Sequence, residues 1–463
     1  MKFRLSPALL GLLLGACAAG PEYQSPAFEP DSGFHQADDP HFTAAAPEQA
    51  WWRTLGDAQL AALVERALVA NHDVLIAQAN VRAARAVLRE DRLSAFPVVT
   101  VAGSVSRENA SAASAAGSGR TETFYDAGFD AVWELDFFGR VRRGVSASAA
   151  EYEAARATRH DAAVIVAAEV ARSYIELRGA QHQLDVALRN ASNQQRTYDL
   201  TRVLAERGRG NSLDVARAQA QLETTLAGIE PLQAAVGRSI HRLGVLVGER
   251  PGKLADELTE RVPLPEMPVR LPVGTPADLL RRRADVRAAE RRLAAATARI
   301  GVAAADLFPR ISLLGTAGFL ATSGDAFGDS GSKRTAIGPF LSWPAFDLGR
   351  VRARMRAADA NADARLSAYE KTVLLALEET ESTLLDFARS TARLQHLEVA
   401  AGASERAVEL ARFRYRNGLD SFLNVLDAER RQLEAEDELA RAVTGRALTF
   451  VALYKALGGG WDV

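Results

Sequence analysis

The sequence predicts a mainly α-helical chain with a small β part, in which one structural unit occurs twice. Three observations lead to this prediction. Short motifs recur at a nearly constant offset, two segments of about 68 residues lack proline, and four short segments alternate apolar and polar residues. We therefore expect one long helical hairpin per copy, attached to a pair of strands.

The composition excludes several classes of protein. The 463 residues are 48% hydrophobic and 25% charged, as in an ordinary folded chain. With a net charge of −2, the chain has no excess of basic residues, so no nucleic-acid partner is expected. The seven histidines show no metal-ligand spacing. Gly328-Asp329-Ser330-Gly331 resembles a protease nucleophile loop but has no suitable His/Asp context. We predict that the protein is not an enzyme and holds no metal or cofactor.

The N-terminus predicts a lipoprotein signal peptide over residues 1–16. A basic start precedes the apolar run Ala8–Ala16, which is too short to span a bilayer. Leu14-Gly15-Ala16-Cys17 matches the box at which the cysteine is acylated and becomes the new N-terminus. Stable anchoring needs several acyl chains, palmitate among them, on Cys17. Ala18 fits sorting to the outer membrane, and a plain secretory signal with a chance cysteine is the alternative.

The rest of the chain is a tandem duplication, with offsets of 210 to 212 residues between the copies. The matched pairs are Trp133 and Trp343, Gly139-Arg140-Val141-Arg142 and Gly349-Arg350-Val351-Arg352, Glu169 and Glu379, Asp73-Val74 and Asp285-Val286, and Phe96-Pro97 and Phe308-Pro309. The predicted domains are an anchored extended or equatorial segment (17–70), the first copy (71–248), a proline-rich linker or equatorial segment (249–283), the second copy (284–457) and a tail (458–463).

Each copy is expected to begin with a short helix and to contain a very long one. The short helices, 71–93 and 284–307, end at a Phe-Pro pair because proline stops a helix. The long helices, Gly139–Arg207 and Gly349–Arg416, contain no proline. At 1.5 Å per residue, each would extend about 100 Å, far beyond an ordinary globular helix.

The long helices carry the signal of paired helices. The second has an apolar seam with a period of about 3.5 residues, which is the coiled-coil period. Its members are Leu366, Tyr369, Val373, Leu377, Thr380, Leu384, Phe387, Thr391 and Leu394. Turns containing Gly208 and Gly210, and Gly418 and Leu419, then reverse the chain into a return helix. An isolated two-helix hairpin is the alternative.

Four segments are predicted to be strands. Between Thr123 and Leu135, apolar residues occupy the odd positions and carboxylates several of the even ones, which places the two kinds on opposite faces. Val99–Ser106 and Ile311–Phe319 alternate more weakly, and Thr335–Ala345 contains two prolines. In a membrane barrel the apolar face meets lipid and the polar face lines water.

Two tryptophans mark the ends of these strands, and the strand number implies association. Trp133 and Trp343 sit where a strand gives way to a long helix, so they are predicted to lie at the membrane interface, with burial at the junction as the alternative. Four strands cannot close a barrel, because about eight is the usual minimum, and unpaired edges do not survive in lipid. Three copies giving twelve strands is the simplest solution, although counting also allows two or four.

Four stretches resemble the outer-membrane factor (TolC-like) family, and in particular its lipoprotein branch, similar to OprM and NodT. They are Cys17–Tyr23, Trp133–Arg142, Leu279–Glu290 and Phe308–Leu313. The resemblance covers nearly the whole mature chain. Ala284 stands where the family usually has proline, which should slightly alter one helix start.

The resemblance implies a homotrimer with a twelve-stranded β-barrel, four strands per protomer, continuous with a periplasmic α-helical tunnel. Such a trimer is the exit duct of a tripartite efflux pump, works with a periplasmic adaptor protein and an inner-membrane pump of the RND type, and has no chemistry of its own. Two alternatives remain open. One is the outer-membrane duct of a type I protein secretion system, and the other is a periplasmic coiled-coil lipoprotein without a pore.

The resemblance also implies a gate at the periplasmic tip of the helices. By position, Leu423 and Asp427 match the family's constriction residues, and they are four apart on one helix face. TolC carries a second carboxylate where this chain has Asn424. Asp214 and Arg217 occupy the equivalent stretch of the first copy. The turn tips are expected to contact the adaptor. For Asp427, a solvated helix-surface acid is the alternative.

Overall fold

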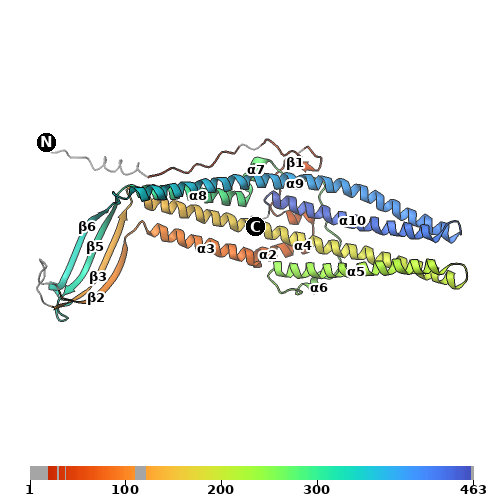
Figure 1. Ribbon diagram of the computed structural model, residues 1–463, viewed down its shortest axis with the longest axis horizontal. Helices are drawn as coiled ribbons and strands as arrows, with labels where there is room; N and C mark the ends of the chain where they lie inside the picture. The colour runs from red at the N-terminus through yellow and green to blue at the C-terminus, as the bar shows by residue number, and fades with distance from the viewer. Residues whose placement is uncertain (1–18, 29–30, 37, 110–120, 460–463) are drawn as a thin grey trace. The chain divides into compact units, whose positions relative to one another are not determined.

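The computed structural model describes residues 19–28, 31–36, 38–109 and 121–459 (Figure 1). Within these residues the chain divides into two compact units. Unit 1 comprises the described parts of Met1–Ala27, Asn80–Arg156 and Ala288–Lys371, and unit 2 comprises those of Phe28–Ala79, Ala157–Arg287 and Thr372–Val463. Cys17 lies outside the described residues, so its predicted acylation stays a prediction.

The two copies have the same order of elements, as the offsets predict. The first copy consists of α3 (His72–Leu93), β2 (Val98–Asn109), β3 (Thr121–Leu135), α4 (Arg140–Glu206) and α5 (Ser212–Leu246). The second consists of α8 (Ala284–Ala305), β5 (Arg310–Ala321), β6 (Lys333–Ser342), α9 (Leu348–Arg416) and α10 (Phe422–Ala456). The two long helices have 67 and 69 residues, and the predicted proline stops end both short helices.

The four strands form one antiparallel sheet in unit 1, in the order β2-β3-β5-β6. The central pair joins the two copies, with Trp133 opposite Leu313 and Asp130 opposite Thr316. This register puts the apolar odd residues of β3 beside apolar residues of the neighbouring strands. Asp126, on the other face, forms an ion pair with Arg334 at 2.8 Å. The predicted separation into an apolar and a polar face is confirmed for β3. The proline-containing β6 pairs as a strand but does not separate cleanly, because Phe340 lies opposite Ser312 and Lys333 opposite Phe319.

The predicted seam of α9 is largely buried. Val373, Leu384 and Phe387 are fully buried, and so is Thr380. The Thr380 hydroxyl donates to the carbonyl of Ala376 at 2.8 Å, so this threonine enters the seam without an unsatisfied group. In unit 2 the seam meets a large core in which Trp51 stacks on Tyr454.

The two regions predicted to be an extended or equatorial segment and a linker or equatorial segment both contain short helices. Residues 17–70 include helix α2 (Ala58–Ala70), which begins at the side-chain cap of Asp57, and a short 3-10 helix, η1 (Trp51–Leu55). The linker contains α6 (Ala255–Leu258) and α7 (Pro276–Arg282). The two regions are also joined, because β1 (Phe42–Thr43) pairs in parallel with β4 (Leu271–Pro272).

The junction between α7 and α8 persists although Ala284 replaces the family's proline. Arg283 has φ −60° and ψ 126°, an extended conformation of the kind that precedes proline. The helices therefore still break at the same residue. Among the described residues, no helix is both long enough and apolar enough to cross a bilayer.

Candidate functional site

The tips of the two helical hairpins have the same turn. Gly208 and Gly418 adopt positive φ values of 71° and 70°, which favour glycine. After Gly208, the Arg209 amide donates to the carbonyl of Leu204 at 2.8 Å, and after Gly418, the Leu419 amide donates to that of Arg414 at 2.9 Å. These are the bonds of a Schellman cap, which satisfies the last carbonyls of a helix.

The residues predicted to form the gate and the adaptor contact lie at these tips. Leu419 and Leu423 are exposed by 65% and 54%, so the tip of the second hairpin presents two neighbouring apolar side chains to solvent in the single chain. Gly210 follows the first turn, where a Cβ atom would lie 3.2 Å from the amide nitrogen of Ala205. The first turn therefore favours a small residue at position 210, whereas the second turn has Asp420 at the equivalent position.

Asp427 lies on the first turns of α10 and has local partners that the sequence analysis did not consider. Its carboxylate accepts from Arg431 at 2.9 Å and from Arg430 at 3.1 Å. The hydrogen bond from Arg431 is the main cause that lowers the pKa of Asp427 below its ordinary value. The residue is therefore ionised at neutral pH, and two arginines reduce the field it exerts.

Asp214 and Arg217 lie at the start of α5 in the first copy. Asn211 caps this helix, because its side-chain oxygen accepts from the Asp214 amide at 2.8 Å. Arg217 and Asp214 come only to 3.8 Å of each other, which is a weak exposed pair. The structure thus places all the predicted tip residues within the first turns of α5 and α10 or in the turns before them.

A buried carboxylate just beyond the predicted gate joins the two hairpins. Glu429 has a side chain that is only 4% exposed, and it accepts from Arg412 of α9 at 2.8 Å. It also accepts from the hydroxyl of Thr197, on α4 of the first copy, at 2.9 Å. Its second oxygen, Oε2, has no partner among the described residues. Glu429 could not be identified from the sequence, because nothing in its spacing distinguishes it from the exposed acids of α10.

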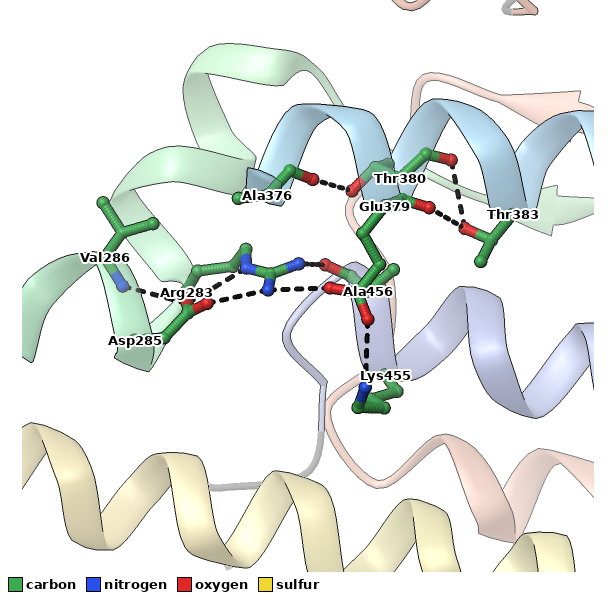
Figure 2. A network of polar contacts seen from close by, with 9 residues as sticks. All are labelled: Arg283, Asp285, Val286, Ala376, Glu379, Thr380, Thr383, Lys455 and Ala456. Carbon is green, nitrogen blue, oxygen red and sulfur yellow. Dashed lines mark hydrogen bonds and ion pairs between the residues drawn. The ribbon is translucent and has the colours of Figure 1, made fainter. Parts of the chain in front are cut away.

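A second polar network fixes the root of the second hairpin (Figure 2). Arg283 donates to the carbonyl of Ala456 at 2.7 Å and to Glu379 at 2.9 Å, and it pairs with Asp285 at 2.8 Å. Lys455 donates to the other oxygen of Glu379 at 3.0 Å. Three segments, the start of α8, the middle of α9 and the end of α10, therefore meet at one guanidinium group.

Opposing effects set the charges of this network. Burial alone would raise the pKa of Glu379, but Lys455 and Arg283 outweigh burial and lower that pKa. Burial alone would lower the pKa of Arg283, and the carboxylates of Asp285 and Glu379 reverse the shift. Both groups are therefore held in their charged forms.

The first copy makes the equivalent link with a neutral side chain. Asn71 precedes Arg283 by 212 residues, and its amide group donates to the carbonyl of Leu246 at 2.9 Å. Leu246 precedes Ala456, the acceptor for Arg283, by 210 residues. The duplication offsets could have identified this pair from the sequence, since they match both the donor and the acceptor.

The predicted interface tryptophans occupy equivalent places in unit 1. The indole nitrogen of Trp133 donates to the carbonyl of Ala95 at 2.9 Å, and that of Trp343 to the carbonyl of Leu307 at 3.0 Å. Neither ring is buried, and Trp343 is 49% exposed. Contact with the membrane interface and its alternative, burial at the strand–helix junction, both stay predictions.

Comparisons with known proteins agree on one family. A family model described as outer membrane efflux protein matches residues 63–249 and 275–459. Outer membrane protein OprJ of Pseudomonas aeruginosa is 32% identical over 99% of this chain and 96% of its own. The toluene efflux pump outer membrane protein TtgC of Pseudomonas putida is also 32% identical, with the same coverage.

Solved structures give the same result. The outer-membrane channel OprN is 43% identical, with a TM-score of 0.92, over 96% of this chain and 100% of its own. The open state of the Neisseria gonorrhoeae MtrE outer membrane channel is 28% identical, with a TM-score of 0.83, over 96% and 99%.

Proposed function

Because this chain belongs to the outer membrane efflux protein family and is an outer-membrane channel of an efflux pump, we propose that three copies assemble into one exit duct. In each copy the four strands contribute to a twelve-stranded β-barrel, and the long helices contribute to a periplasmic tunnel. Substrates pass through without chemical change, so we assign the chain no catalytic role and no cofactor.

The observation that carries this proposal is the sheet of unit 1. Its edge strands, β2 and β6, have no second neighbour among the described residues. A four-stranded sheet with one apolar face cannot close on itself, since about eight strands are needed. Pairing β6 of one copy with β2 of the next satisfies both edges, and three copies supply twelve strands.

The experiment that tests the proposal measures assembly and conduction together. The purified full-length protein should run as a trimer in detergent and produce discrete conductance steps in planar bilayers. A monomeric protein, or a trimer that never conducts, would contradict the duct.

We further propose that the tips face a periplasmic adaptor, through which the duct meets an inner-membrane pump of the RND type. The exposed side chains of Leu419 and Leu423 support this role, because exposed apolar residues mark contact surfaces. Acylation of Cys17 would anchor the N-terminus in the outer membrane. Mass spectrometry of the mature N-terminal peptide tests the anchor directly, and an unmodified Cys17 would exclude it.

The gate is proposed at Leu423 and Asp427, with Asp214 and Arg217 beside them. Three Asp427 carboxylates would favour cations at the aperture, and Leu423 would supply the hydrophobic stop. Because Arg430 and Arg431 already pair with Asp427, the preference for cations should be modest. Asp427→Ala should lower the ratio of cation to anion permeability, measured as a shift of reversal potential in a salt gradient. An unchanged reversal potential would count against the ring, with Glu434→Ala as an exposed control on the same helix.

A further inference from the structure

The outer part of α3 carries a row of arginines that the channel function does not use. Arg82, Arg85, Arg89 and Arg92 recur at intervals of three and four residues, so they share one face of the helix. All four are exposed, and in the part of the chain that the structure describes none of them pairs with a carboxylate. Together with Arg156 and Glu153 of α4, they line a cavity of about 800 Å³ in unit 1, and Glu153 is paired with Arg291.

A second cavity continues from this row toward the sheet. It has a volume of about 700 Å³ and shares Arg92 with the first. Most of its other walls come from the end of β3 and the start of α4. Two of them are carboxylates, Glu134 and Asp136, which pair with Arg140 and Arg142. The apolar lining residues are Ala95, Trp133, Leu135, Phe137, Val141 and Val145.

The sheet indicates which side of the molecule these cavities occupy. Trp133 belongs to the apolar face, since its register partner on β5 is Leu313 and the next position on that face pairs Leu135 with Ile311. In a membrane-spanning sheet the apolar face meets lipid. Arg92 shares this cavity with Trp133 and Leu135 of the apolar face and with Glu134 of the other face, so it lies at the end of the sheet where α3 reaches the strands.

The second copy shows what covers the same face there. Arg82, Arg85, Arg89 and Arg92 correspond, at the offset of 212, to Ala294, Thr297, Gly301 and Ala304. The chain's own N-terminal segment lies on this face of α8, because a Cβ atom on Gly20 would lie only 2.5 Å from the Cα atom of Gly301. Tyr23 continues along α8 and donates to Glu290. That segment directly follows the predicted lipidation site.

We propose that the arginine face of α3, formed by Arg82, Arg85, Arg89 and Arg92, binds the phosphate groups of anionic phospholipids in the periplasmic leaflet of the outer membrane. The guanidinium groups bind the phosphodiester through charge-assisted hydrogen bonds. The apolar cavity at Trp133 takes the glycerol and the first carbons of an acyl chain. Arginines close to an anionic lipid surface each strengthen binding about fivefold, and the effect fades over a Debye length of about 8 Å.

The proposal rests on the membrane location of the sheet in the proposed duct, and its test is separate from conduction. The purified full-length protein in detergent is incubated with phosphatidylglycerol or phosphatidylcholine, and native mass spectrometry counts the retained lipids. Phosphatidylglycerol should be retained, and the triple variant Arg85→Gln/Arg89→Gln/Arg92→Gln should retain it at least tenfold less. The matched control, Arg207→Gln/Arg209→Gln/Arg416→Gln, removes the same charge at the hairpin tips and should retain lipid normally.

Further arms separate the other occupants of this face. Equal retention of phosphatidylcholine, or displacement by inorganic phosphate at equal concentration, would overturn the lipid assignment. Loss of the oligomer in the lipid-free triple variant would show that a second copy covers the arginines, which also overturns it. The variant with lysine at positions 85, 89 and 92 keeps the positive charge and should still bind phosphatidylglycerol. If the triple glutamine variant does not fold, Arg89→Gln alone replaces it and should retain less phosphatidylglycerol than the wild type. If the triple variant keeps its conductance in phosphatidylcholine bilayers, the proposed duct stands regardless of how much lipid the variant retains.

Discussion

The two copies of the repeat have the same fold, but their equivalent contacts use different chemistry. At the root of the first hairpin, Asn71 joins α3 to the end of α5 with a neutral amide. At the root of the second, Arg283 makes the same connection and adds two carboxylates and Lys455. The backbone acceptors, the carbonyls of Leu246 and Ala456, are equivalent. The geometry of this backbone link is therefore common to both copies, whereas only the second copy makes it with a guanidinium group. Glu169, the equivalent of Glu379, pairs instead with Arg172 and Arg242 of its own copy.

The return helices differ in the same direction. Glu429 of α10 is buried between the hairpins, while Gln219, its equivalent in α5, is exposed. A buried charge is costly to leave unpaired, so its contacts must form or break together. At these two equivalent positions the second copy uses a charged side chain where the first has a neutral amide, although the first copy supplies charged partners elsewhere, such as Glu151 for Arg299.

The largest expected effect sharpens the comparison at the roots. Arg283→Ala should lower the free energy of unfolding by about 2–3 kcal/mol, because it removes a donor from the partly exposed carboxylates of Asp285 and Glu379 and the side-chain donor from the carbonyl of Ala456. Asn71→Ala should cost about 1–2 kcal/mol, since it removes only neutral hydrogen bonds. Urea unfolding in detergent, followed by circular dichroism, measures both. Equal losses for Arg283→Ala and Asn71→Ala would contradict the distinction between the two roots. As a control, Arg281→Ala removes only the exposed ion pair with Asp278 and should have almost no effect on the free energy of unfolding.

The next effect concerns the contact between the hairpins near the tip. Glu429→Gln should weaken the bonds to Arg412 and Thr197 by about 1.5–3 kcal/mol, the range for hydrogen bonds to charged groups. We expect the second hairpin to separate more readily and the mean single-channel conductance to rise. Gln219→Ala, at the exposed equivalent position, should leave the conductance unchanged. A Glu429→Gln channel indistinguishable from the wild type would show that this bridge does not hold the tip.

Much of the fold could be predicted because its signals are local. Prolines stop the short helices, the absence of proline permits the long ones, and alternation identifies the strands. Helix α2 was missed although its signals were readable: Asp57 is a good cap, and Leu60, Leu63, Val64 and Ala67 follow at helical spacing. The β1–β4 pair could not be found, since strands of two residues carry no periodicity.

The tip was predicted only in part for a different reason. Gly208 and Gly418 predict the two turns, because many helices end at a glycine that adopts a positive φ. Glu429 gave no such signal, since its burial depends on Thr197, which lies 232 residues earlier on a helix of the other copy. Contacts of this kind follow from how the hairpins pack, and a single sequence does not determine that packing. The equivalence of Asn71 and Arg283 was available from the offsets alone.

A third prediction tests where the copies meet. Gly179 of α4 faces α10 so closely that an added Cβ atom would lie 2.4 Å from the Cγ2 atom of Thr444. Gly179→Ala should therefore destabilise the protein by about 1–2 kcal/mol, after allowing for the higher helix propensity of alanine. Gly228→Ala, on α5 with no atom within 4 Å, should stabilise it by about 0.5–1 kcal/mol. Adding Thr444→Ala to Gly179→Ala should restore most of the lost stability, because it removes the methyl group that the new Cβ atom meets. If Gly179→Ala and Gly228→Ala changed the stability in the same direction, the close approach of α4 and α10 at Gly179 would be contradicted.

The smallest effect is a difference in pH dependence between the two roots. The pKa of Glu379 lies below its unfolded value, so its charge stabilises the folded state fully above the unfolded pKa of about 4.3. That stabilisation is lost as the pH falls through the lower, folded pKa. The wild type should therefore be more stable than Glu379→Gln at pH 7, and the difference should shrink progressively below about pH 4.3. Because the Glu379 side chain is one-third exposed, solvent screening keeps the difference modest. The cost of Asn71→Ala should not follow this acid dependence, since an amide does not titrate. Thermal unfolding in detergent at a series of pH values measures the loss of stability caused by each variant. If Glu379→Gln and Asn71→Ala show parallel pH profiles, the charge at the second root does not contribute to the stability of the link that both copies share.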